Sequence, residues 1–374
     1  VVGLIAPIAA NASEANLREV NNYSQDNLGI TSDSFKPLSS KNPLLAGGEG
    51  LDNDHDHSED FNADTFSSTT SASFTSNWGL GAVDGTAQDN IGFIFDWGLE
   101  LTTSFTGNDS LDVAIEGGNA SLMTELDLAS SSNVVGVDSI SYTTNLGDRA
   151  TFFFGNGASA GSALYNTACV YEAAKDTLSD CGVASANFDE EFGTALAASF
   201  DLGNGFSTSL AYEGQGTSTN GLLTEEGADA YGAQIAYSND SVGVSLSWAN
   251  IENHTNGTLG SGVSTYTGIN AYYTPELENF PTISVGFETS HDDSAADASD
   301  NSTHYFLGAQ WNDVLSGSVG AAIGSKEPYA ENADAETMYE VFYSYEYADG
   351  ITVTPLLYVK ENAAAGTEDE QGVI

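Results

Sequence analysis

From about residue 65 onward, apolar and polar residues alternate along this chain with a period of two. The longest run has apolar side chains at successive odd positions from Ile91 to Leu101, and Asp96, Gly98 and Glu100 lie between them. Neighbouring side chains of a β-strand point to opposite faces, so such a segment has one apolar and one polar face. The pattern predicts an all-β protein.

The connections between these runs are short and long in turn. Short ones carry Gly, Asn and Asp in turn positions, as in Thr106-Gly107-Asn108-Asp109 and Ala348-Asp349-Gly350. The longer ones fall at about 117–136, 155–191, 213–229, 250–264, 290–303, 324–336 and 361–371. Short periplasmic turns and long external loops are typical of outer-membrane barrels, whose apolar faces contact lipid. We therefore expect a transmembrane antiparallel up-and-down β-barrel over 65–374, with about 16 strands.

The last strand is expected to begin at Gly372-Val373-Ile374 and to be incomplete in this sequence, since a spanning strand needs about 9–11 residues. Pro355 lies inside the expected strand from Thr352 to Val359, where it removes one donor from the ladder. The first strand, within 65–83, alternates only weakly.

The charge of the chain limits its partners. Lys and Arg total 7 and Asp and Glu total 54, which gives a formal net charge of −47. Nucleic-acid binding is excluded because phosphate recognition needs cationic side chains, and docking on anionic lipid is disfavoured for the same reason. A pore that attracts cations fits this charge.

The first 64 residues differ from the rest. Residues 1–12 end in Ala10-Asn11-Ala12 and are expected to be the remainder of a secretory signal, or else an ordinary apolar segment. Residues 13–64 are polar and predict an acidic linker. Its tract from Asp52 to Asp60, with His55 and His57, is either a solvated linker or a site for a divalent cation.

Several hairpin sequences resemble those of the cyanobacterial outer-membrane porins, which are related to the carbohydrate-selective (OprB-like) porin family. These are Leu101 to Leu111, followed by Glu116-Gly117-Gly118-Asn119; Tyr142 to Asp148; Gly320 to Gly324; and Asp349 to Leu356, which includes Pro355. The resemblance covers about 65–374. It implies a sixteen-stranded, trimeric pore in the outer membrane for small hydrophilic solutes and inorganic ions. The surface-layer-homology domain of such relatives is not recognisable in 13–64, so tethering to peptidoglycan is not implied.

The candidate functional residues are carboxylates on the polar face of the strands. Parity places eight of them in the lumen: Asp96, Glu100, Asp112, Glu116, Glu213, Glu288, Glu340 and Glu346. Rings of like charge in a pore select counter-ions, so we expect a cation preference. The alternative is that these groups only solvate a wide lumen wall.

No catalytic, metal-binding or cofactor-binding constellation is recognisable, because the five histidines lack any triad or metal-ligand spacing. We therefore expect no enzyme, metal or cofactor. The alternative to a channel is a non-conducting extracellular β-rich surface protein or adhesin.

The loop at about 155–191 is the third on the long-loop side and the longest. It contains Cys169 and Cys181, which are expected to form a disulfide in an exported protein. It also carries the charged group Glu172, Lys175 and Asp176, and a short helix is predicted over 170–178. Such a loop either folds into the lumen as a constriction or lies outside, with the disulfide protecting it from proteases.

Overall fold

The computed structural model describes residues 70–85, 90–120, 126, 128–129, 131–174, 176–188, 193–216, 221–224, 227–255, 258–277, 279–293, 300–326, 328–330, 333–362 and 368–374. The predicted signal segment (1–12), the linker (13–64) and its acidic tract lie outside these residues. All structural statements below concern the described part.

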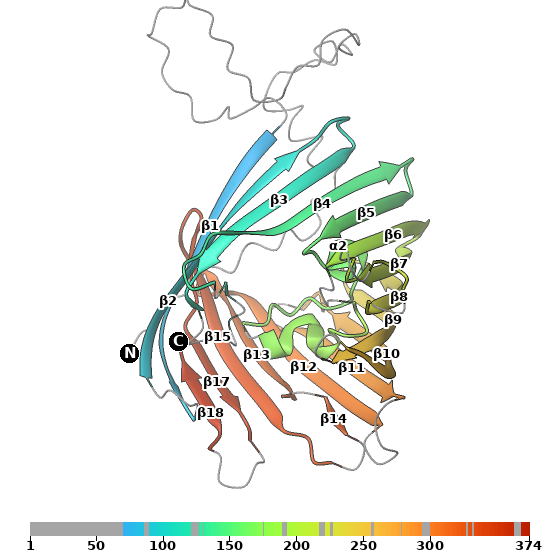
Figure 1. Cartoon of the computed structure of the whole chain (residues 1–374). Coiled ribbons are helices and arrows are strands. Elements are labelled where there is room, and N and C mark those ends of the chain that lie inside the picture. The colour runs from blue at the N-terminus through green and yellow to red at the C-terminus, as the bar shows by residue number, and fades with distance from the viewer. Residues whose placement is uncertain are drawn as a thin grey trace, which may run out of the picture. The chain divides into compact units, whose positions relative to one another are not determined.

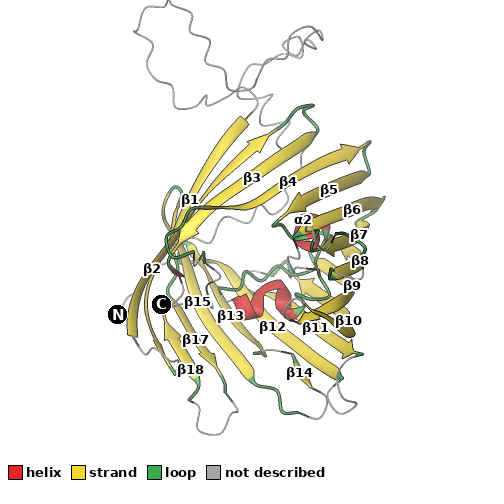
Figure 2. Ribbon diagram, viewed as in Figure 1, coloured by secondary structure: helices red, strands yellow, loops and turns green. Residues whose placement is uncertain are grey.

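The described chain forms one antiparallel sheet of eighteen strand segments that closes on itself (Figures 1 and 2). The segments are β1 (Thr70–Asp84), β2 (Asn90–Thr103), β3 (Asp109–Gly118), β4 (Gly136–Leu146), β5 (Ala150–Asn156), β6 (Thr194–Gly203), β7 (Phe206–Gly214), β8 (Asp229–Ser238), β9 (Val242–Thr255), β10 (Thr258–Tyr273), β11 (Thr282–Asp292), β12 (Asn301–Val314), β13 (Gly317–Ser325), β14 (Tyr329–Ala330), β15 (Thr337–Ala348), β16 (Ile351–Val353), β17 (Leu356–Lys360) and β18 (Glu370–Val373). β1 pairs with both β2 and β18, which closes the barrel.

Not every segment is a barrel strand of its own. β14 lies within the connection between β13 and β15 and is not counted as a barrel strand. β16 and β17 are two parts of one strand interrupted at Pro355 and count once. The eighteen segments therefore make sixteen barrel strands, and the predicted fold class is confirmed. Pro355 still accepts a hydrogen bond through its carbonyl oxygen from the Tyr343 N–H (3.1 Å), so the proline removes only one donor from the ladder.

The outward face of the barrel is apolar across neighbouring strands. Leu246, Ile269 and Phe287 lie side by side on β9, β10 and β11, and each side chain is close to half exposed. An exposed apolar band of this kind is what a lipid-facing barrel wall requires. No described helix has the length and apolar character needed to cross a membrane.

One predicted loop is wrong. Residues 250–255 and 258–264 lie in β9 and β10, which form one long hairpin instead of a loop over 250–264. Nearby outward positions are polar there, as at Asn250 and Thr265, whose side chains share a hydrogen bond of 3.0 Å. The apolar alternation ends while the backbone ladder continues. A prediction from side-chain polarity alone therefore starts the loop before the strand has ended.

The connection between β5 and β6 contains the short helix α2 (Ala160–Leu164) and the 3-10 segment η4 (Asp176–Gly182). The helix predicted over 170–178 is therefore wrong for residues 170–174, whereas 176–178 lie in η4. Residues 170–174 are not helical because their backbone N–H groups bond to the barrel wall instead of to one another.

Two apolar clusters lie inside the barrel, between loops and wall. The first joins the η4 region and residues Ala120 and Leu126 of the β3–β4 loop to β12, β13, β15 and β17. The second joins α2 and Phe188 to β5–β9. These clusters place long-loop residues inside the barrel, and they define the position of the candidate site.

Candidate functional site

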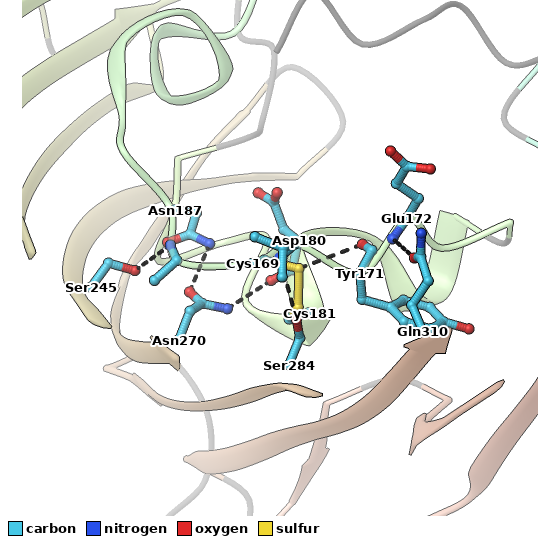
Figure 3. The surroundings of a disulfide bond; sticks show 12 residues. Cys169, Tyr171, Glu172, Asp180, Cys181, Asn187, Ser245, Asn270, Ser284 and Gln310 are labelled. Carbon is cyan, nitrogen blue, oxygen red and sulfur yellow. Dashed lines mark hydrogen bonds between the residues drawn. A yellow bond between two sulfur atoms is a disulfide. The ribbon is translucent and has the colours of Figure 1, made fainter. Parts of the chain in front are cut away.

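The described residues of the segment 157–193, called the inner loop below, lie against the inner face of the barrel wall (Figures 1 and 3). From residue 168 onward every second backbone N–H donates to a wall side chain. The pairs are Ala168 to Ser245 (3.0 Å), Val170 to Ser284 (3.2 Å), Glu172 to Gln310 (3.1 Å) and Ala174 to Glu340 (3.2 Å). The acceptors lie on β9, β11, β12 and β15, so this stretch crosses the strands in an extended conformation.

Three of the predicted lumen carboxyl groups are hydrogen-bonded to the inner loop. Glu213 accepts the Ala160 N–H (2.6 Å), Glu288 accepts the Ala186 N–H (2.6 Å), and Glu340 accepts the Ala174 N–H. These glutamates are 0%, 3% and 1% exposed. They therefore lie behind the loop rather than in an open lumen.

Tyr171 makes a second contact with Glu340. Its hydroxyl donates to the Glu340 Oε1 atom (2.7 Å), and its ring packs against Phe306 and Phe342 with centroid distances of 5.4 and 5.9 Å. Burial, together with the Glu340 carboxyl, raises the pKa of the Tyr171 phenol well above its usual range. The phenol thus stays protonated and can donate.

Glycines on the inward face of the wall make room for the loop. A Cβ atom at Gly308 would lie 2.7 Å from the Tyr171 ring, and one at Gly324 would lie 2.8 Å from Leu178. The inward glycines that contact the loop lie on β8, β10, β11, β12 and β13: Gly232, Gly268, Gly286, Gly308 and Gly324. We call this set the glycine lane, and any side chain there would displace the loop.

The disulfide predicted between Cys169 and Cys181 is present, with a Cα–Cα distance of 5.9 Å (Figure 3). It joins the extended stretch of the inner loop to η4. Beside it, the Asp180 carbonyl oxygen accepts from the Asn270 Nδ2 atom of the wall (2.9 Å). The two parts of the loop are therefore tied to each other and to β10.

The charged residues predicted for this loop are only partly described. Glu172 is exposed, and its carboxylate points away from its wall partner Gln310 (Figure 3). Lys175 and the side chain of Asp176 lie outside the described part.

Asp96 binds the β3–β4 loop and the neighbouring strand. Its Oδ1 atom accepts from the Asn77 backbone N–H and side-chain amide (3.2 and 2.8 Å), and its Oδ2 atom accepts from the Ala129 N–H (3.3 Å). Asp96 therefore resembles the three glutamates in supporting a loop inside the barrel.

Glu100, Asp112 and Glu116 lie on the inward face of β2 and β3, where side chains are exposed or half-buried. Glu116 is opposite Gly98, Glu100 is opposite Ala114, and Asp112 is opposite Thr102. Successive carboxylates are thus diagonal neighbours, about 7–8 Å apart in an antiparallel pair. They form a line along the barrel wall. Glu346 is also exposed, near the short-turn end of β15.

Few cations oppose these carboxylates. Within the described residues, Lys and Arg occur at Arg149, Lys326 and Lys360. Arg149 is exposed in the β4–β5 turn, and Lys326 forms an ion pair with Glu336 in the β13–β15 connection. Lys360 on β17 is paired with Glu370 on β18. The line of carboxylates on β2 and β3 has no Lys or Arg at a paired position on β4.

The residues that hold the loop by neutral contacts were not predicted. They include Ser209, Gln234, Ser245, Ser284 and Gln310, which bond to the inner loop, and the glycine lane. A partial signal was present: on β8–β13 most inward positions are small or carry an amide or hydroxyl, with exceptions such as Glu288, whereas β2 and β3 carry several inward carboxylates.

The fold is that of known porins. No family model matches the chain, and no curated protein matches it. Among solved structures, a mutant of the Rh. blastica porin shares 14% identity, with a TM-score of 0.51, over 81% of this chain and 98% of that chain. A loop-deletion mutant of OmpT, an outer membrane protein of Vibrio cholerae, shares 11% identity and a TM-score of 0.56 over 82% and 98% of the two chains. Salmonella typhi OmpF, in complex with daunomycin, shares 12% identity and a TM-score of 0.54 over 81% and 96%. The chain therefore has a porin-like fold.

Proposed function

We propose that this protein is a non-enzymatic outer-membrane channel through which small hydrophilic solutes and ions diffuse passively, with a preference for cations. The observation that carries the proposal is a closed, externally apolar barrel whose longest loop lies inside it. A loop in this position would narrow a water-filled interior and so set the size of the solutes that pass. A non-conducting surface protein gains nothing from such an arrangement and is not favoured.

The cation preference is supported by the line of carboxylates on β2 and β3. Glu100 is exposed on the inner face, and the exposed Glu172 of the inner loop adds a further carboxylate. Like charges along a pore with low-dielectric walls concentrate counter-ions. The net charge of −47 acts in the same direction.

The partners proposed for this channel are outer-membrane lipid, inorganic ions and small solutes that include carbohydrates. A homotrimer and a cyanobacterial origin are proposed from the hairpin resemblance and from the porin-like fold. An N-terminal export signal at 1–12 belongs to the same proposal.

The test is reconstitution of the purified chain into planar bilayers. We expect stepwise single-channel conductance and, in a potassium chloride gradient, a reversal potential of the sign for cation preference. A protein that inserts without conducting would overturn the proposed channel function. An anion-selective reversal potential would overturn the proposed cation preference and leave the channel function standing.

A further inference from the structure

Three inward-facing glutamates differ from Glu100 and Asp112 in what they contact. We propose that Glu213, Glu288 and Glu340 are positioning residues that hold the inner loop against the barrel wall, and that charge selectivity arises mainly from Glu100, Asp112 and Glu116 of β2 and β3. This inference rests on the proposed channel function. The proposal assigns two roles, setting the width of the pore and selecting ions by charge, to different residues. The alternation of side chains along the strands alone places all of these residues in one inward-facing set.

The three glutamates support the loop at widely separated points. They lie on β7, β11 and β15, and they receive the N–H groups of Ala160, Ala186 and Ala174. These alanines stand near the start, the end and the middle of the inner loop. A carboxyl oxygen is a strong acceptor for a backbone N–H. Removing it leaves a buried donor without its partner, which favours displacement of the loop.

A small residue lies on at least one side of each glutamate. Glu213 is paired with Ala195 and Ala230, Glu288 with Gly268 and His304, and Glu340 with Ala322 and Tyr358. At Gly268 an added Cβ would collide with the Val183 side chain and would approach that of Ala186 to 2.9 Å. At Glu288 the wall therefore combines an acceptor with a space that side chains of the inner loop fill. A carboxylate serving only to attract ions needs neither a buried position nor small neighbours.

The decisive experiment compares glutamine with alanine at each kind of position. Glutamine removes the charge but keeps an acceptor oxygen, whereas alanine removes both. In planar bilayers, Glu340→Gln should keep the wild-type single-channel conductance, and Glu340→Ala should change it and add closing events. At the exposed control position, Glu100→Gln and Glu100→Ala should shift the reversal potential equally and leave the conductance noise unchanged.

Hydrogen exchange of the inner loop provides a readout that does not depend on conduction. In the detergent-solubilised protein, peptides spanning Ala174 should exchange about tenfold faster in Glu340→Ala than in wild type, which corresponds to about 1.4 kcal/mol. Glu340→Gln should stay close to wild type, and so should Glu100→Ala. Equal exchange in all four proteins would overturn the positioning role, even if the wild-type protein conducts.

A milder variant covers the case in which Glu340→Ala does not assemble. Tyr171→Phe keeps the ring between Phe306 and Phe342 and removes only the hydroxyl that donates to Glu340. It should raise exchange in the same loop by a smaller factor. If Glu340→Gln shifts the reversal potential as much as Glu100→Gln while loop exchange stays unchanged, Glu340 is a selectivity residue and the inference is wrong. If the wild-type protein does not conduct but the exchange pattern holds, only the channel function fails.

Discussion

The inner surface of this barrel has two regions that look alike in sequence and differ in the folded protein. On the covered wall, from β7 to β15, inward polar side chains such as Ser245, Asn270 and Ser284 are almost completely buried beneath the inner loop. On the open wall, on β2 and β3, inward carboxylates remain exposed or half-buried. Both regions follow the same period-two pattern.

The difference teaches that the polar face of a barrel strand can serve either water or another part of the chain. On the covered wall the inward side chains accept hydrogen bonds from backbone N–H groups of the inner loop. An extended stretch of loop cannot satisfy these N–H groups within itself. A buried backbone N–H needs a partner. The wall therefore supplies the partners that a helix would otherwise supply, and the stretch 168–174 is fixed without helical or strand structure of its own.

The largest expected effect comes from filling the glycine lane. A side chain at Gly286 would overlap the Cys181 carbonyl oxygen, which is backbone and cannot rotate away. We expect Gly286→Val to displace the inner loop and to raise single-channel conductance several-fold. The matched change on the open wall, Gly98→Val, meets only the Thr75 hydroxyl and should leave the loop in place. An unchanged conductance in Gly286→Val would contradict the view that the covered wall, unlike the open wall, holds the inner loop in place.

The next largest effect concerns the disulfide. Replacing both Cys169 and Cys181 with serine should increase conductance noise and make the inner loop more sensitive to proteases. Closing a loop of this size contributes roughly 3 kcal/mol in the entropy model, through the unfolded chain. Addition of a reductant to the wild-type protein should have the same effect. If noise and proteolysis both stay at wild-type levels, the hydrogen bonds to the covered wall suffice to hold the loop.

Neutralising the open wall should act on selectivity alone. Glu100→Gln combined with Asp112→Asn should move the reversal potential towards zero while conductance stays near that of wild type, because neither side chain contacts the inner loop in the hydrogen bonds observed. Asp96→Asn is a less clean test, since Asp96 also accepts from the β3–β4 loop. A larger selectivity change from Glu288→Gln than from the open-wall pair would reverse the roles of the two walls.

The smallest effect is a pH dependence at Tyr171. Its phenol pKa is raised in the folded protein, so unfolding releases a proton above the ordinary tyrosine pKa of about 10. The corresponding stability is fully present below pH 10 and is lost as pH rises above it. In heat-modifiability gels run from pH 9 to 11, Tyr171→Phe should lose stability less steeply than wild type. Parallel slopes would show that Tyr171 ionises no differently in the two states.

The fold was predictable from the sequence because the alternation and the turn positions report local geometry. The runs on β2, β9 and β11 and the alternating connections were enough to predict the sixteen-stranded barrel. The boundary at 250–264 was missed because Asn250 and Thr265 are polar while still paired in the ladder. The helix predicted over 170–178 does not form at 170–174, because Ala173 and Ala174 favour a helix locally but the wall accepts the backbone N–H hydrogen bonds that a helix would need.

The candidate site was predictable only in part. Parity predicts which face of a strand a carboxylate occupies, and it gave the inward set from Asp96 to Glu346. It cannot indicate which inward groups another segment will cover, because that depends on contacts between residues far apart in sequence. Glu213 and Ala160 are 53 positions apart, and Tyr171 and Glu340 are 169 apart.

The way the inner loop is held has a consequence for engineering. The wall binds residues 168–174 mainly through hydrogen bonds to their backbone N–H groups. The side chains of Val170 and Glu172, both exposed, are therefore not needed to hold the loop. Those two positions should accept a wide range of residues without rearrangement of the scaffold. If the barrel conducts as proposed, its lining can be changed at these chosen points, which is what the design of sensing nanopores requires.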